Sequence, residues 1–352
     1  MRSIFIVAMI CISGVLYAGN PERIGQAGGT QLLVNPFARS SGLNGINVSF
    51  CSGIESFITN PAGIASMKGS EIIFSHTRWM VGSGINVNSF GFGQKFRSGG
   101  AFGIGIVAFD LGEFIRTTTD YPDGTLGKFS PTYLNIGISY SHTFVDDKIF
   151  VGATVKMVHE SINDVTANGV AFDAGVQYRD SKEKFKIGVA LRNVSPGMIY
   201  SGDGLSTRAN LGGKSPSFDN SKVATTAAGF EIPSILIIGA SYDLTFGTDH
   251  KLIPTASFIA NSYGYDQIGA GVEYRFKKYL ALRASYIYEA KEIGAEDGRN
   301  AFTGMAGGMS FEMPLSKSTD KVKSNTSFGI DYSYRANWLF SGTHSIGFRL
   351  NF

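Results

Sequence analysis

Apolar and polar residues alternate in segment after segment of this chain, up to its last residue. In 169–179, Phe172 and Val176 fall on one face, and Asp173 and Arg179 fall on the other. The last seven residues repeat the pattern and end on an aromatic residue. Successive side chains of a β-strand point to opposite faces, so each such segment predicts a strand with one apolar and one polar face.

Fourteen segments of this kind can be placed along the chain. They are 71–80, 85–96, 101–114, 131–143, 148–160, 168–179, 184–194, 234–246, 251–262, 266–277, 279–290, 302–313, 325–336 and 342–352. A closed sheet of such strands separates lipid from water without leaving an unpaired edge in hydrocarbon. We therefore predict an all-β fold, a 14-stranded antiparallel transmembrane β-barrel. The segment 222–231 is also strand-like, but an even strand count assigns it to a loop.

Turn lengths predict which end of the barrel faces which compartment. Short turns fall at 98–100, 146–147, 180–183, 247–249 and 277–278, and longer loops at 115–130, 161–167, 195–233 and 291–301. Bacterial barrels keep short turns in the periplasm and long loops outside the cell. We therefore expect an outer-membrane protein of a Gram-negative bacterium with both termini in the periplasm. The turn 314–324 is longer than this rule predicts.

The first 18 residues are typical of a secretory signal peptide. Arg2 is followed by an apolar run, residues 4–15, which is too short to span a bilayer, and Ala18 is a small residue at the expected cleavage site. Removal of this segment leaves Cys51 as the only cysteine, so the mature chain cannot form an intramolecular disulfide.

Composition supports the same class of protein. Aromatic residues make up 12% of the chain and charged residues 17%, and the mean hydropathy is +0.05. A mean this close to zero excludes a bundle of apolar membrane helices but fits strands that alternate. The net charge of +3 is too small and too dispersed for nucleic-acid binding.

Residues 19–70, between the signal and the first strand, lack the alternation. They contain nine glycines, and Pro36 and Pro61 cannot donate to a strand ladder. A floppy periplasmic tail is one interpretation, but the stretches 32–34 and 63–67 are too apolar for a solvated tail. We therefore predict a signal peptide at 1–18, a plug segment at 19–70 inside the barrel lumen, and the barrel at 71–352.

A family resemblance rests on these residues. The run Asn60-Pro61-Ala62-Gly63-Ile64-Ala65, followed by a strand near residue 71, resembles the plug motif of FadL-type fatty-acid channels. The stretches 29–33 and 38–42 and the final strands resemble the PorV/PorQ branch of that superfamily, which is associated with type IX secretion. The resemblance implies a non-enzymatic barrel that binds partner or cargo proteins at the cell surface. The alternative that it implies is a passive channel for long-chain fatty acids or other hydrophobic molecules.

No residue pattern predicts catalysis or a cofactor. The five histidines are scattered without metal-ligand spacing, and Asp146-Asp147 lies in a tight turn, where Asp is favoured for turn formation alone. We therefore expect no enzyme activity, no metal and no cofactor.

Charged residues on the polar strand faces are expected to line the lumen. They are Lys156, Asp173, Arg179, Lys186, Arg192, Glu273, Arg275, Arg283, Glu312, Asp331, Arg335 and Arg349. They could form a path for anions, or an ion-paired lining that holds the plug, and the mixed signs favour the lining. A charged lumen also favours the partner-binding function over the channel.

The loop 195–233 is unusually apolar for a loop. It carries Met198, Ile199, Tyr200, Leu205, Phe218 and Phe230. Such a loop either folds over the barrel mouth or packs against a partner protein.

The alternating C-terminal residues Phe348, Leu350 and Phe352 resemble the signal that directs outer-membrane barrels to their assembly machinery. The expected partners are therefore outer-membrane lipid, the barrel-assembly machinery and a secretion-system or cargo protein, with no nucleic acid.

Overall fold

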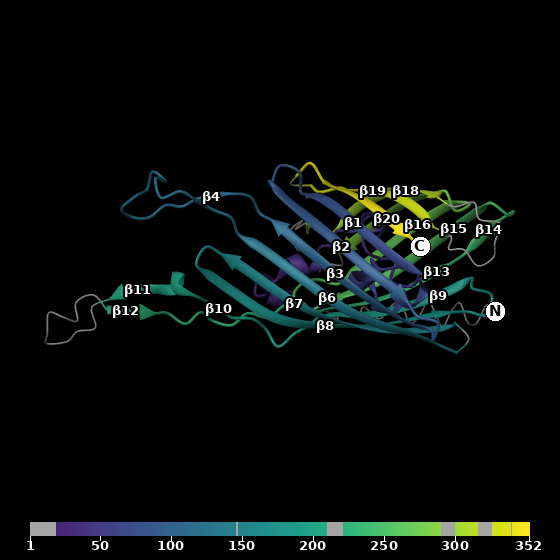
Figure 1. The fold of residues 1–352 in the computed structure, drawn as a ribbon, viewed down its shortest axis with the longest axis horizontal. Helices are drawn as coiled ribbons and strands as arrows, with labels where there is room; N and C mark the ends of the chain where they lie inside the picture. Colours follow the sequence, from purple (N-terminus) through teal and green to yellow (C-terminus); the bar gives the residue numbers. More distant parts are fainter. Residues whose placement is uncertain (1–18, 146, 210–220, 290–299, 316–325, 339) are drawn as a thin grey trace.

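The chain forms a closed antiparallel barrel of fourteen long strands (Figure 1). The structure is a computed structural model that describes residues 19–145, 147–209, 221–289, 300–315, 326–338 and 340–352. The predicted signal peptide, Phe218 and most of the turn 314–324 lie outside these residues.

Each barrel strand pairs with its neighbours in sequence order. The strands are β1 (Ser70–Trp79), β2 (Ile85–Lys95), β3 (Gly100–Asp110), β6 (Thr132–Phe144), β7 (Ile149–Ile162), β8 (Val165–Arg179), β9 (Phe185–Val194), β13 (Ile235–Tyr242), β15 (His250–Asn261), β16 (Gln267–Phe276), β17 (Leu280–Glu289), β18 (Gly304–Pro314), β19 (Ser327–Arg335) and β20 (Thr343–Asn351). Pairing of β1 with β20 closes the barrel. The prediction of a 14-stranded antiparallel barrel is confirmed.

Short elements lie outside this wall. Two hairpins extend beyond one end of the barrel (Figure 1). One pairs β4 (Phe114–Ile115) with β5 (Lys128–Phe129), and the other pairs β11 (Ser206–Ala209) with β12 (Ser221–Ala224). Two further pieces, β10 (Tyr200–Ser201) and β14 (Leu244–Phe246), pair with β8 and β15. The strand-like segment 222–231 thus contributes no strand to the barrel, as predicted, although residues 222–224 form part of β12 in the loop hairpin.

The loop lengths distinguish a long-loop end from a short-turn end. The predicted long loop at 161–167 is wrong, because β7 and β8 continue to Ile162 and Val165. Only Asn163 and Asp164 connect them, and Asn163 has a φ of 52°, which asparagine tolerates better than most residues.

The two faces of the wall differ as the alternation predicts. Outward positions such as Phe172 and Val176 are exposed apolar side chains, whereas Asp173 and Gln177 point inward and are buried. A one-residue slip would exchange the two sets, so the alternation fixes the register. Within the described residues, the structure has no helix long and apolar enough to cross a membrane.

The plug segment crosses the lumen from one end to the other. Its helical turns are η1 (Pro21–Arg23), η2 (Thr30–Leu33), α2 (Ala38–Ser41), α3 (Ser56–Thr59) and η3 (Pro61–Ser66), and a further turn, η4 (Asp203–Leu205), lies in the loop before β11. The amide of Asn20 donates to the carbonyl of Asn261 at the long-loop end, whereas Phe352 pairs with Ser70 at the short-turn end. The prediction that both termini lie on one side is therefore wrong for the described chain, because the plug segment traverses the barrel before β1 begins.

Candidate functional site

The plug segment packs against the inner wall through an apolar cluster. Ile54, Phe57 and Ile64 are buried together with the wall residues Val87 and Val107. The ring of Phe57 meets Phe37 edge-to-face with a centroid separation of 5.7 Å. Burial of these side chains, each of which contributes roughly 1.5–3 kcal/mol, holds the segment in the lumen.

The predicted plug motif lies against neighbouring strands of the wall, chiefly β6, β7 and β8. The side-chain oxygen of Asn60 accepts a hydrogen bond from the amide of Ala62 and so caps η3. Its amide nitrogen donates to the carbonyls of Val48 at 3.0 Å and Val176 at 3.1 Å. One fully buried asparagine therefore joins two parts of the plug segment to the wall.

Glycines on the inner face of the wall make room for this contact. A Cβ at Gly152 would lie 2.5 Å from the carbonyl of Pro61, and one at Gly175 would lie 1.9 Å from the side-chain oxygen of Asn60. A Cβ at Gly188 would lie 2.3 Å from the carbonyl of Val48. Only glycine permits this approach of the plug backbone.

The same feature continues around the lumen and forms a glycine belt. Its members face the plug segment, and several pair across strands, such as Gly91 with Gly105 and Gly188 with Gly239. The members are Gly91, Gly93, Gly103, Gly105, Gly137, Gly152, Gly175, Gly188, Gly239, Gly269 and Gly308. Our sequence analysis missed this belt, although glycine at polar-face positions of consecutive strands was a visible signal.

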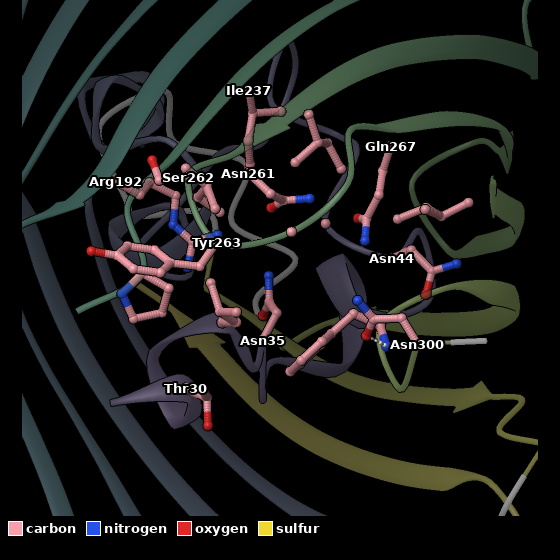
Figure 2. A pocket seen from close by; sticks show the side chains of 18 of the residues that line it. Thr30, Asn35, Asn44, Arg192, Ile237, Asn261, Ser262, Tyr263, Gln267 and Asn300 are labelled. Atoms are coloured by element: carbon pink, nitrogen blue, oxygen red, sulfur yellow. Dashed lines mark hydrogen bonds between the residues drawn. The ribbon is translucent and has the colours of Figure 1, made fainter. Parts of the chain in front are cut away.

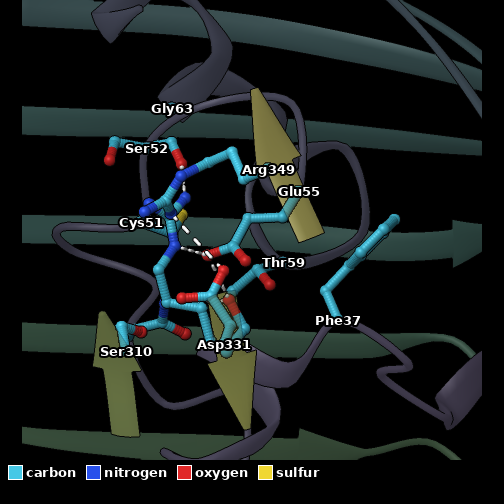
Figure 3. A network of polar contacts seen from close by, with 12 residues as sticks. Phe37, Cys51, Ser52, Glu55, Thr59, Gly63, Ser310, Asp331 and Arg349 are labelled. Carbon is cyan, nitrogen blue, oxygen red and sulfur yellow. Dashed lines mark hydrogen bonds and ion pairs between the residues drawn. The ribbon is translucent and has the colours of Figure 1, made fainter. Parts of the chain in front are cut away.

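A polar network joins the plug segment and the wall near the short-turn end (Figure 3). Within the plug segment, Arg39 pairs with the buried Glu55 at 2.8 Å. In the wall, Arg349 lies 3.1 Å from Glu312 and 3.7 Å from Asp331. Figure 3 shows Glu55, Asp331 and Arg349 converging on one region.

The other charges predicted to line the lumen lie in separate groups. Lys156 pairs with Asp173 at 2.7 Å, and Arg283 pairs with Glu273 at 2.5 Å. Arg275 pairs with the same Glu273. These ion pairs are formed between wall residues and do not reach the plug segment.

Four predicted lumen cations make different contacts. Lys186 pairs with Asp243 at 2.7 Å, and Arg179 lies over the ring of Phe150. Arg192 donates to the plug carbonyl of Leu32 at 3.1 Å, and Arg335 donates to the carbonyl of Phe302 at 3.4 Å. Together with the neutral Gln177, which donates to the carbonyls of Val48 and Cys51, Arg192 connects the wall to the plug segment.

A β-bulge interrupts the pairing of β8 with β9. The register shifts between Phe172 and Ala174, and Asn193 has a φ of 60°. The amide of Asn193 donates to Asp173 at 2.7 Å, and its side chain accepts from Lys156 at 2.5 Å. The bulge therefore turns two successive residues of β9, Arg192 and Asn193, toward the lumen.

A mouth cavity of about 210 Å³ lies above the plug segment at the long-loop end (Figure 2). Apolar side chains form much of its wall, and polar groups are interspersed among them. The apolar members are Leu33, Ile235, Ile237, Ile259, Ile287 and Phe302. Amides and two buried arginines, Arg192 and Arg335, supply the polar part.

The two ends of the loop between β9 and β13, residues 196–200 and 228–234, pack over the mouth of the barrel. Met198 is 2% exposed, and its backbone pairs with Phe230. Both residues pack with Leu32 and Ile232 in one apolar cluster. Of the two interpretations of this apolar loop, the structure shows the folded one for these residues, whereas Ile199 remains exposed.

The beginning of the plug segment is tied to the same loops. Arg23 lies 3.0 Å from Glu231 and donates to the hydroxyl of Tyr263 at 2.6 Å. Tyr263 also donates to Glu231. The hydrogen bonds that Glu231 accepts, first from Tyr263 and then from Arg23, hold the pKa of this carboxyl below its ordinary value.

A basal cavity of about 490 Å³ opens at the short-turn end. Arg39, Glu312 and Arg349 from the polar network line it, together with Glu71 and Lys278. The mouth cavity stops at Asn35, which donates to Thr59, and neither the mouth cavity nor the basal cavity includes Asn60. The plug segment thus separates the two cavities.

The predicted assembly residues lie on and beyond β20. Phe348 points outward and stacks on Phe328 with a centroid distance of 6.3 Å. Leu350 lies on the same face, and Phe352 is exposed at the short-turn end. The described residues contain no cluster of metal-ligating side chains.

Comparisons with known proteins address the fold. No protein-family model and no curated protein sequence match the chain. The structure is similar to the toluene transporter TbuX of Ralstonia pickettii, with a TM-score of 0.53 and 16% identity over 90% of this chain and 97% of that one. The CymD monoaromatic hydrocarbon channel gives 0.53 and 14%, with the same coverage. The toluene transporter TodX of Pseudomonas putida gives 0.51 and 13%, again with the same coverage.

This chain has the fold of these transport proteins. The similarity extends over nearly the whole length of each, although at these identities it shows the fold alone.

Proposed function

We propose that this chain is a FadL-like outer-membrane channel for small hydrophobic or amphipathic molecules. The observation that carries the proposal is the mouth cavity, whose apolar wall includes Ile237, Ile259 and Ile287. A concave apolar site with a few polar groups is the usual form of a small-molecule site. The channel was the alternative in our sequence analysis, and the cavity together with the fold of the neighbours favours it over partner binding.

The outer surface supports a location in a membrane. Its exposed side chains are large and apolar on successive strands, as at Val155, Phe172 and Ile268. A polypeptide can expose such a surface to lipid only as a closed barrel or a helix, because its backbone groups must be satisfied internally. The long-loop end then faces outside the cell and the short-turn end faces the periplasm.

Arg335 suggests a polar feature of the transported molecule. It is 7% exposed, lines the mouth cavity and has no carboxylate partner among the described residues. Besides its hydrogen bond to the carbonyl of Phe302, this buried cation has no compensating charge there, so a ligand with an acidic head and an apolar body would satisfy both parts of the cavity wall.

Transport requires the plug segment to move. The mouth cavity ends above Asn60, and the glycine belt encloses the segment below it. We propose that ligand binding in the mouth cavity shifts the contacts around Asn35 and Thr59, so that a path opens past the plug segment.

Filling the cavity tests this function. Ile237→Trp adds volume to the cavity wall, whereas Ile238→Trp adds the same volume on the outer face. Uptake of a radiolabelled long-chain fatty acid or of toluene by cells that produce each variant should fall at least about fivefold for Ile237→Trp only, because interiors have no room for extra bulk. Equal uptake by both variants and the parent would contradict the proposal, provided that all three reach the membrane in equal amounts.

Partner binding of the PorV type is the second candidate. The hairpin that contains β4 and β5 projects from the barrel with Phe114, Ile115 and Tyr121 exposed. Exposed apolar groups on a projecting loop suit a protein partner, such as a component or cargo of a type IX secretion-like system. Replacement of residues 114–129 by a short Gly-Ser linker should abolish co-purification of a stoichiometric partner and leave uptake unchanged if this function is correct.

A further inference from the structure

Charge is almost absent from the outer face of the barrel. Across all outward positions of the fourteen strands, which lie wholly within the described residues, only Arg78 and Asp110 carry a formal charge at neutral pH. Asp110 accepts a hydrogen bond from the amide of Gly112 and so belongs to the turn that follows β3. Arg78 is therefore the one outward Lys or Arg on these strands.

The neighbours of Arg78 are polar as well. In the strand register, Arg78 lies opposite His344 of β20 and opposite Asn86 of β2. His76 is the next outward residue of β1 toward the bilayer centre. Its Nδ1 lies within hydrogen-bond distance of the side-chain oxygen of Asn88, at 2.8 Å. These five residues form an outer polar patch on β20, β1 and β2, near the long-loop end.

Aromatic residues border the patch on β19. The hydroxyl of Tyr332 lies 2.8 Å from Nδ1 of His344, and the ring of Tyr334 lies 5.0 Å from the imidazole. Tyrosine at this depth is typical of the zone where lipid headgroups meet hydrocarbon. The patch therefore lies at the headgroup level of the bilayer, if the barrel spans a membrane as proposed above.

Arg78 has no acidic partner there among the described residues. Asp110 is separated from it by Asn86 in the same row. An arginine on the outer face is costly at the bilayer midplane and far less costly near the interface, so Arg78 is tolerated at this depth, although nothing in the strand ladder requires it. Its planar guanidinium is suited to bidentate contact with a phosphate, and imidazole and amide groups can donate further hydrogen bonds.

We propose that the outer polar patch binds the phosphate of a lipid headgroup in the leaflet at the long-loop end. Arg78 holds two phosphate oxygens, and His344, held by Tyr332, and Asn86 contact the headgroup from the flanking strands. The acyl chains then lie along the apolar outer face below the patch, where the exposed side chains of Phe74, Phe90 and Phe348 form one row across β1, β2 and β20. This inference rests on the proposed membrane location but not on the transport function.

Lipid binding by the full-length, detergent-purified protein tests the proposal. Native mass spectrometry with diphosphorylated lipid A and with dephosphorylated lipid A compares one lipid with and without its phosphates. The parent protein should prefer the phosphorylated form by about tenfold or more, because charge-assisted hydrogen bonds to the phosphate would be lost with the other form. Arg78→Gln should remove this preference while leaving binding of the dephosphorylated form unchanged.

Two comparisons make the result specific. Arg116→Gln removes an exposed arginine from the loop after β4 and should keep the preference, since Arg116 contacts Asp164 and is remote from the patch in the strand register. Arg78→Lys should weaken the preference, because an ammonium cannot form the bidentate contact. An equal preference in the parent and in Arg78→Gln would overturn the proposal. A protein that stays monodisperse without detergent and binds neither lipid would instead contradict the membrane location.

Discussion

Gly175 of β8 and Asn60 of the plug segment are in contact so close that no other residue fits at position 175. A Cβ there would lie 1.9 Å from the side-chain oxygen of Asn60, where ordinary contacts of a Cβ begin at 3.4 Å. The same asparagine caps η3 and donates to Val176 of β8. The position of the plug motif is thus determined by a missing side chain in the wall.

Gly175→Ala should therefore displace Asn60 and loosen the plug segment. We expect a loss of about 1–3 kcal/mol in the free energy of unfolding, as for other overpacked sites, measured by urea titration in lipid vesicles. Gly307→Ala is the matched control, since a Cβ at this outward position would meet only the carbonyl of Arg283, at 3.5 Å. Stability of Gly175→Ala equal to that of the control would show that the contact is not restrictive.

An arginine on the outer face should report the depth of a residue in the bilayer. Val176→Arg places a charge on the exposed apolar face of β8 and should destabilise the barrel by about 2–4 kcal/mol if the site is at the midplane. Thr166→Arg, on the same face near the long-loop end, should cost about 0–1 kcal/mol. Equilibrium unfolding in vesicles measures both, and equal costs would contradict the proposed orientation in the membrane.

Cys51 should be unreactive in the folded protein. Burial raises the pKa of its thiol from 9.0 to about 12, so the thiolate that reacts with maleimides is scarce at neutral pH and is also inaccessible. The raised pKa stabilises the fold below pH 9, and this contribution is lost as the pH rises from about 9 toward 12, because only the unfolded thiol ionises there. Unfolding at pH 7.5 and pH 10.5 should therefore show a larger decrease for the parent than for Cys51→Ala.

Loss of Phe352 should impair assembly more than stability. Residue 352 lies beyond the last residue of β20, so its deletion removes only the backbone pair of Phe352 with Ser70 and leaves the ladder between β20 and β1 intact up to Asn351. If the aromatic end is an assembly signal, outer-membrane levels in cells should fall several-fold, and Phe352→Trp should restore them. Unchanged levels after deletion would limit the role of Phe352 to its apolar surface.

Local alternation determined the wall of this protein. The period of two in segments such as 168–179 fixes which residues face lipid and which face the lumen, and each strand needs only its own residues to show it. The number of barrel strands, the face on which each strand residue lies and the exclusion of 222–231 from the barrel could therefore be predicted. The two-residue turn at Asn163 was not predicted. β7 and β8 stay paired through their backbones beyond the segments in which apolar and polar residues alternate, so the sequence pattern ends before the strands do.

The contents of the lumen were decided by the tertiary structure. Glu273 pairs with both Arg275 and Arg283, whereas Arg335 has no carboxylate partner among the described residues. Both outcomes depend on which strands become neighbours and on where the plug segment runs, and alternation carries no information on either. The mouth cavity has the same origin, since Ile237, Ile259 and Ile287 come from three strands and meet only when the barrel closes. A pattern within one strand fixes its faces, whereas a site between strands is fixed only by closure and packing.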